Sequence, residues 1–248
     1  MARKFHRLFY FSDARLGFLA LLMVCVPGFV QGKPNDKLMN RPYADLKPWH
    51  LGFSVGFHVQ DVNFTHNGFL TPDGEKWSME VPNFSPGFCL NVMGDLRLHQ
   101  YVNLRFSPGI YFGSKSVVMM EYFTGEKLRQ DIKTAYVVTP LDIKFSGNRL
   151  HNVRPYLTAG VMGAFDVTKK HTNYLIFNTC DAYLTIGLGM DFYLPFFKLI
   201  PEVKFCFGLT DILRHKRPDL EDDFQTYKIT QSLSKVKSNM VVINFYFE

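Results

Sequence analysis

The sequence predicts an all-β fold: a closed, eight-stranded antiparallel transmembrane β-barrel of a bacterial outer membrane, with short periplasmic turns and long extracellular loops. Eight stretches alternate apolar residues with polar or small ones, and the connections between them alternate between long and short. The composition combines a mean hydropathy of -0.05 with 25 Phe and 12 Tyr. A barrel wall needs an apolar outer face, a polar lumen and aromatic girdles at both membrane interfaces, which together require such a composition.

The first stretch begins at Trp49. From Leu51 to Val59 every second residue is large and apolar, whereas the residues between them are Gly, Ser or His. This period of two indicates a strand with one apolar and one polar face. The alternation recurs over residues 88–98, 102–112, 137–145, 156–165, 182–192, 199–209 and 241–247. We expect a bulge or local break at Pro108 and at Pro140, because proline cannot donate a ladder hydrogen bond.

The connections separate the two ends of the barrel. Their lengths run roughly 26, 3, 21, 8, 16, 5 and 27 residues, the alternation that outer-membrane barrels have. A soluble sandwich or a lipocalin-like barrel is the alternative, and it would place the apolar faces inside. The other face here is rich in Gly, Ser, Thr and charge, which favours the filling of a narrow lumen.

The first 32 residues have the pattern of a signal peptide. Four Lys or Arg within residues 3–15 precede the apolar run Leu16–Val30. Cleavage after Gly32 is predicted, with Gly28 as a rival position. A retained membrane anchor is the alternative, although a spanning helix needs about 20 residues. The organisation predicted is a signal peptide over 1–32, a periplasmic amino-terminal segment over 33–48 and a barrel over 49–248.

Charge and cysteine content limit the classes of partner. Removal of residues 1–32 takes away four bases and one acid, which lowers the net charge from +6 to +3. The remaining bases are interspersed with acids, so nucleic acid is not an expected partner. Cys89, Cys180 and Cys206 are odd in number and have no C-x-x-C spacing, which predicts three packed free thiols rather than a disulfide framework or a zinc site. No metal or other cofactor is expected.

Eight charged residues are expected to point into the lumen near the short turns. With the amino end in the periplasm, the alternation in each strand fixes which side chains face inward. The set comprises four acids and four bases: Asp95, Arg97, Arg105, Asp142, Lys144, Asp191, Glu202 and Lys204. Such charges must pair at this depth, so the sequence predicts a structural charge network below a tighter, less polar upper lumen. A pathway for protons or small solutes is the alternative interpretation.

Catalysis has little support in the sequence. Candidate side chains for an active site on the long loops are His66, Asp73 and Ser78 in the first loop and Asp166 and His171 in the third. Their spacing matches no catalytic motif, and polar loop residues on a solvated surface explain them. The chain is therefore predicted not to be an enzyme.

Three stretches resemble the PorT family. They are RPYADLKPWHLGFSVGF from Arg41, SPGFCLNVMGDLRLHQYVNLRFSPGIYFG from Ser85, and KSNMVVINFYFE at the end. The pattern DLRL-x-x-Y-x-NLRF-x-PG is the most specific part, since strand periodicity does not dictate those side chains. The end departs from the outer-membrane pattern of a final aromatic residue, because Glu248 follows Phe247.

Membership of that family would imply a non-enzymatic outer-membrane component of the type IX secretion system. This system exports proteins that carry carboxy-terminal sorting domains and serves gliding motility in gliding bacteria. The implied partners are outer-membrane lipid and other envelope proteins of the system, and no catalytic residues come with the resemblance. The alternative is a free-standing small outer-membrane barrel for adhesion or small-solute passage.

The segment before the first strand is a candidate docking element. It is too polar for a barrel wall and carries three prolines. We expect Arg41, Tyr43, Asp45 and Trp49 to hold it against the periplasmic turns, with the two aromatic residues as anchors near the membrane boundary. A flexible tether between the cleavage site and the barrel is the alternative.

Overall fold

The computed structural model describes residues 39–66, 77–80, 85–121, 127–168, 178–212 and 233–248. The chain divides into two units, Met1–Met39 and Asn40–Glu248, and the description below concerns the second. The predicted signal peptide lies outside the described residues. Within the ranges given above, no helix is long and apolar enough to cross a membrane.

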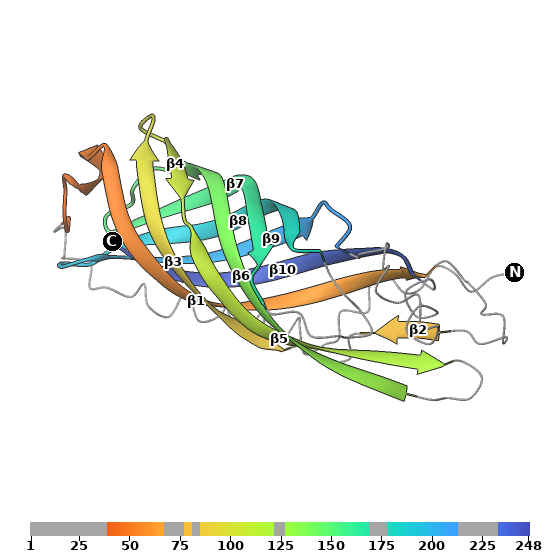
Figure 1. Ribbon diagram of the computed structural model, residues 1–248. Helices are drawn as coiled ribbons and strands as arrows, with labels where there is room; N and C mark the ends of the chain where they lie inside the picture. Colours follow the sequence, from red (N-terminus) through yellow and green to blue (C-terminus); the bar gives the residue numbers. More distant parts are fainter. Residues whose placement is uncertain (1–38, 67–76, 81–84, 122–126, 169–177, 213–232) are drawn as a thin grey trace, which may run out of the picture. The chain divides into compact units, whose positions relative to one another are not determined.

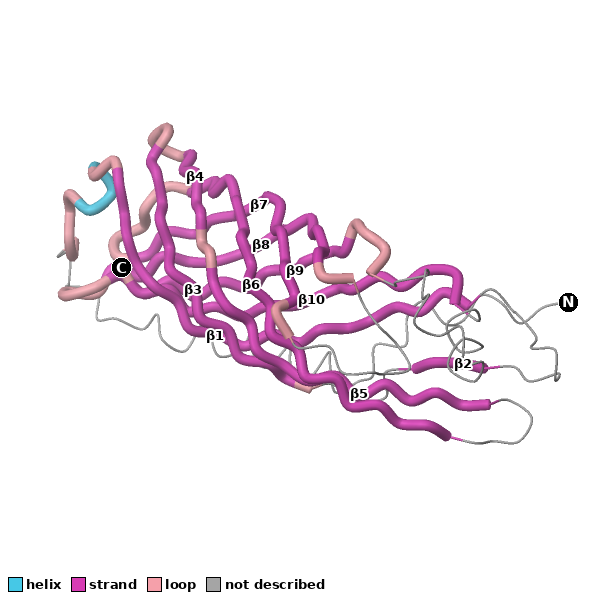
Figure 2. Tube along the Cα trace, viewed as in Figure 1, coloured by secondary structure: helices cyan, strands magenta, loops and turns pink. Residues whose placement is uncertain are grey.

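The described residues form ten strands that pair in antiparallel fashion around a closed sheet (Figures 1 and 2). The strands are β1 (Trp49–His66), β2 (Trp77–Glu80), β3 (Pro86–Arg97), β4 (Val102–Phe106), β5 (Gly109–Glu121), β6 (Lys127–Ser146), β7 (Val153–Asp166), β8 (Cys180–Tyr193), β9 (Lys198–Gly208) and β10 (Leu233–Phe247). The sheet closes because β1 pairs with both β10 and β3. β4 and β5 each pair with β3 and β6, so they are two halves of one wall strand. The predicted eight-stranded wall is confirmed, and β2 is an additional short strand on the outer part of β5.

Pro108 interrupts a strand, whereas Pro140 does not. The predicted break at Pro108 is confirmed, because it separates β4 from β5. The predicted break at Pro140 is wrong, since β6 continues through it and pairs there with Met162 of β7. The backbone N–H of Ser107 donates to the Pro140 carbonyl at 3.2 Å. The amide and carbonyl of one strand residue face the same neighbour, so the missing N–H of Pro140 faces the interruption between β4 and β5.

Burial follows the predicted alternation along the wall. In β1, Leu51, Phe53 and Phe57 are 75%, 56% and 57% exposed, whereas Ser54 and His58 are 1% and 2% exposed. β3 repeats the pattern from Pro86 to Asp95. An apolar exterior around a polar, buried lumen is the arrangement of a membrane barrel and the reverse of a soluble one.

One predicted long loop is mostly strand. A connection of roughly 21 residues was expected between the third and fourth wall strands, whereas the ladder of β5 and β6 extends to Met120 opposite Lys127. Figure 1 shows this hairpin projecting past β3, β7, β8 and β9, on the side to which β1 and β10 also extend. Its sequence contains an apolar run over residues 117–120 but no sustained alternation of apolar and polar residues, so periodicity did not reveal it. A two-stranded ribbon is held by backbone hydrogen bonds and needs no such alternation.

Side chains fill the upper lumen, toward the long loops. A buried cluster contains Cys89, Tyr111, Tyr136, Val138, Met162, Ala164, Tyr183, Cys206, Met240 and Val242. Narrow barrels have an interior that side chains can fill in this way. The expectation of packed thiols holds for Cys89 and Cys206 but is wrong for Cys180, which is exposed at the start of β8.

Candidate functional site

Arg105 is the centre of the lower lumen, on the side of the short turns. Its guanidinium donates hydrogen bonds to Glu202 at 2.9 Å and to Asp95 at 3.2 Å. The same group lies 5.2 Å and 5.0 Å from the ring centres of Tyr156 and Tyr246. Its side chain is 0% exposed, so both carboxylates and both rings replace water around a permanent charge.

Lysine and carboxylate pairs surround this centre. Lys204 lies 2.5 Å from Asp142 and 3.3 Å from Glu202. Lys144 donates to both carboxylate oxygens of Asp191 at 2.8 Å. These side chains are nearly completely buried, so the lower lumen is a packed ionic network rather than a water-filled channel.

The structure brings together seven of the eight lumen residues that the alternation selected. Arg97 is the exception: it borders the same region but forms no ion pair within the described parts of the chain. Sequence reasoning missed Lys198, which lies 3.3 Å from Asp191. Lys198 has the same parity as Glu202 and Lys204, so extending the alternation backwards along β9 would have found it.

The residues before β1 lie across the short-turn end, and we call Asn40–Lys47 the strap. A single 3-10 turn, η2 (Ala44–Leu46), shapes it. Asp45 accepts a hydrogen bond of 2.5 Å from the hydroxyl of Tyr193. The Asp45 carboxylate also lies 3.6 Å from Arg149 and 3.6 Å from Arg154. The strap is therefore anchored to the ends of β7 and β8 and to the turn between β6 and β7.

Arg149 holds the other side of the strap. Its guanidinium donates to the carbonyls of Asn40 and Arg41, the latter at 3.2 Å. It also stacks 3.6 Å above the ring centre of Tyr193. No periodic pattern marks Arg149, because it lies in a turn and its partners in the strap are more than 100 residues away.

The four docking candidates are placed differently. Asp45 anchors the strap as described, and Arg41 donates to the backbone carbonyl of Glu248 at 3.1 Å. Tyr43 and Trp49 are 74% and 64% exposed. The strap thus holds on through its polar side chains, whereas Tyr43 in the strap and Trp49 at the start of β1 are exposed.

Glu248 links the end of β10 to the network. Its carboxylate accepts from His50 at 2.6 Å and from Lys198 at 3.2 Å, and its side chain is 7% exposed. Burial alone would raise the pKa of Glu248. The hydrogen bond from His50 and the charge of Lys198 outweigh burial and lower this pKa to about 2.

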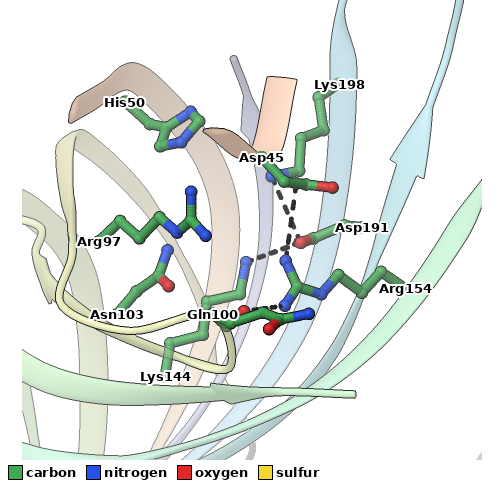
Figure 3. Close-up of a pocket in the computed structure, with 9 residues that line it drawn as sticks. All are labelled: Asp45, His50, Arg97, Gln100, Asn103, Lys144, Arg154, Asp191 and Lys198. Carbon is green, nitrogen blue, oxygen red and sulfur yellow. Dashed lines mark hydrogen bonds and ion pairs between the residues drawn. The ribbon is translucent and has the colours of Figure 1, made fainter. Parts of the chain in front are cut away.

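A small polar pocket remains between the strap and the network (Figure 3). Its lining is rich in cationic side chains: Asp45, His50, Arg97, Gln100, Asn103, Lys144, Arg154, Asp191 and Lys198. Arg154 is held in this lining by the carbonyls of Gly147 and Gln100, at 2.8 Å and 2.7 Å.

The catalytic candidates do not gather into a site. Asp73 and His171 lie outside the described residues, and His66 and Ser78 belong to β1 and β2. The carboxylate of Asp166 accepts from the backbone of Thr168 at 2.9 Å, which is a local turn contact. Within the described ranges, no group of three or more His, Cys, Asp or Glu could hold a metal ion.

Comparison with known proteins agrees with this architecture. The profile of the outer membrane protein beta-barrel domain matches residues 29–214. The chain belongs to this family. Its members lie in the outer membrane, so the apolar exterior of this barrel faces lipid. No curated protein matches the chain.

Solved structures of small barrels are similar only at a distance. Neisserial surface protein A (NspA) has a TM-score of 0.42 at 10% identity, over 81% of this chain and 98% of that one. The N-terminal β-barrel domain of OprF from Pseudomonas aeruginosa has a TM-score of 0.36 at 13% identity, over 78% and 97%. The attachment invasion locus protein Ail of Yersinia pestis has a TM-score of 0.36 at 11% identity, over 81% and 98%.

Proposed function

We propose that this chain is a free-standing, non-enzymatic outer-membrane barrel that acts by contact at its ends and passes no solute through its lumen. The observation that carries the proposal is the complete burial of Arg105 between Asp95 and Glu202. A lumen bridged by buried ion pairs offers no continuous water path. Of the two functions considered for a free-standing barrel, adhesion is therefore favoured over the passage of small solutes.

The projecting ribbons support contact at the long-loop end. The ladder of β1 and β10 continues to His66, whereas β3 leaves β1 at Val59. Asp61, Asn63 and Lys133 are exposed on these ribbons. Polar side chains on a rigid projection suit binding to hydrophilic surfaces outside the membrane.

Orientation is part of the proposal. We place the short turns in the periplasm and the projecting ribbons outside the cell, after export by a signal peptide cleaved at Gly32. An epitope inserted near Asp73 or Asp222 should then be labelled on intact cells, whereas one inserted at Asn148 should not. The reverse labelling pattern would overturn this orientation.

Two measurements, one on the purified barrel and one on a deletion strain with its complemented counterpart, test contact against passage. Liposomes that contain the purified barrel should take up small sugars no faster than empty liposomes. A deletion strain should lose attachment to surfaces, recover it on complementation, and keep its permeability to small solutes. Faster sugar uptake together with unchanged attachment would contradict the proposal.

A second candidate function is a role in type IX secretion, which rests on the resemblance to the PorT family. The observation that favours it is the strap, whose Tyr43 and Leu46 are 74% and 62% exposed beside the anchored Asp45. Exposed aromatic and aliphatic side chains on a fixed element are suited to bind another envelope protein. In this proposal cargo passes through a partner, because the lumen is filled.

The strap offers a direct test of this candidate. The double variant Tyr43→Ala, Leu46→Ala removes the exposed side chains and leaves the Asp45 anchor in place. Loss of secreted sorting-domain proteins with normal barrel insertion would support docking. The control Leu98→Ala removes an apolar side chain that is 59% exposed outside the strap. Normal secretion in a deletion strain would exclude the secretion role.

A further inference from the structure

The ion-paired side chains of the lower lumen and the strap balance in charge, and one base of the pocket lining has no partner among them. Ion pairs connect six bases, Arg105, Lys144, Arg149, Arg154, Lys198 and Lys204, with six acids, Asp45, Asp95, Asp142, Asp191, Glu202 and Glu248. Arg97 borders the same pocket and forms no ion pair within the described residues. Among the Arg and Lys side chains that line the pocket, Arg97 is therefore the one without a carboxylate partner within the described residues.

Arg97 points into the pocket. Figure 3 shows its guanidinium directed toward the space between His50, Asn103 and Lys144, with no interaction drawn to it. The residue is half-buried, so water screens its charge less than on an open surface. A permanent charge that is partly withdrawn from water is stabilised by a nearby counter-charge.

Neighbouring groups have unused donors. Lys198 has three N–H donors and uses two, toward Asp191 and Glu248. The Asn103 amide has two and uses one, toward Asp95 at 2.5 Å. One N–H of each therefore has no acceptor within the described residues. Spare donors beside an unpaired guanidinium are the environment that an anion requires.

The size of the pocket limits the ligand. It has room for about one water-sized particle. A halide ion is larger than water but smaller than sulfate or phosphate, which has four oxygens around a central atom. Water would satisfy the spare donors but would not offset the charge of Arg97.

We infer that the pocket beneath the strap binds one small monovalent anion of chloride size against Arg97. The anion would offset the charge of Arg97, with Lys198 and Asn103 as further donors. This site is independent of the proposed functions, because it concerns how the barrel end is held closed.

Halide-dependent unfolding tests the site in the purified barrel. The apparent unfolding midpoint is measured at constant ionic strength and scan rate while sodium chloride replaces sodium gluconate. The wild type should show a saturable rise of about 2–4 °C, and Arg97→Gln should show none. Lys47→Gln removes an exposed base from the strap that does not line the pocket, so it should respond like the wild type.

Crystals of the wild type soaked in bromide provide a second readout that does not depend on the folding of a variant. An anomalous peak within contact distance of the Arg97 guanidinium is expected. No peak at Arg97, or an equal chloride response in Arg97→Gln, would overturn the inference. A response to sulfate as large as that to chloride would contradict the size limit and reject the assignment to a halide.

Discussion

Arg105 on β4 and Glu202 on β9 form a hydrogen bond of 2.9 Å directly across the barrel. Their strands are separated by β6, β7 and β8 in one direction and by β3, β1 and β10 in the other. The bond therefore joins opposite walls. A hydrogen bond that crosses the lumen between opposite walls leaves no open pore at that level. The Arg105–Glu202 bond therefore supports a function that the ends of the barrel perform by contact.

Replacement of Arg105 tests this bridge. Arg105→Leu leaves the carboxylates of Asp95 and Glu202 without their shared partner, so we expect a loss of about 3 kcal/mol in the free energy of unfolding. Urea unfolding and heat-dependent mobility on gels measure it. Lys133→Leu, on the exposed part of β6, should change stability by less than about 0.5 kcal/mol. An unchanged midpoint for Arg105→Leu would mean that water reaches the lower lumen.

Gly189 makes room for Tyr156 on the neighbouring strand. A Cβ at Gly189 would lie 2.3 Å from the Tyr156 hydroxyl oxygen. Gly189→Ala should therefore cost about 1–3 kcal/mol through displacement of the ring. Gly94→Ala is the matched control, because its Cβ would meet no atom closer than 3.9 Å. Equal stability of the two variants would contradict the close packing described for this part of the lumen.

Most of the wall could be predicted from the sequence because alternation reports directly on which face is buried. The inward parity of Arg105, Asp142 and Glu202 follows from that rule alone. The rule fails where apolar and polar residues do not alternate, which is why the β5–β6 ribbon was interpreted as a loop. It also could not foresee that Pro140 is tolerated, because this depends on the interruption in the facing strand.

The partners of the strap on the barrel were beyond sequence reasoning for a different reason. Asp45 meets Tyr193 across 148 residues, and no periodicity relates the two. Arg41 in the strap and His151 in the opposing turn both have positive φ angles, of 48° and 55°. Residues other than Gly rarely adopt this conformation, so local sequence preference gives no indication of it. The segment was identified as a docking candidate, but its anchors on the barrel were not.

Asp45 should control how firmly the strap is held. Asp45→Asn retains an acceptor for Tyr193 but removes the charge that faces Arg149 and Arg154. Since the carboxylate is 26% exposed, we expect a loss of about 1 kcal/mol, or roughly fivefold faster amide exchange in the strap. Mass spectrometry of hydrogen exchange over residues 40–47 measures this, with Lys47→Gln as the control. Unchanged exchange in Asp45→Asn would show that backbone contacts alone hold the strap.

The lowered pKa of Glu248 predicts that the free energy of unfolding depends on pH. Its pKa is about 2 in the folded chain, below the value of about 4.3 in an unfolded one. A lowered pKa stabilises the fold above the unfolded value, and that stability is lost as the pH falls toward 2. The wild type should exceed Glu248→Gln by up to about 3 kcal/mol at pH 6, with the difference shrinking between about pH 4 and pH 2. A difference that is constant over this range would argue against the contacts with His50 and Lys198.

Ion conductance tests the central claim most directly. The purified chain is inserted into a planar lipid bilayer in concentrated potassium chloride, and the current is recorded for the wild type and for a variant that lacks residues 40–47. The network around Arg105 fills the lumen with side chains of the wall strands and does not depend on the strap. The current with either protein should therefore equal the current through a bilayer without protein. Stable single-channel current steps from the wild type would contradict a closed lumen, and with it a barrel that acts only through its ends.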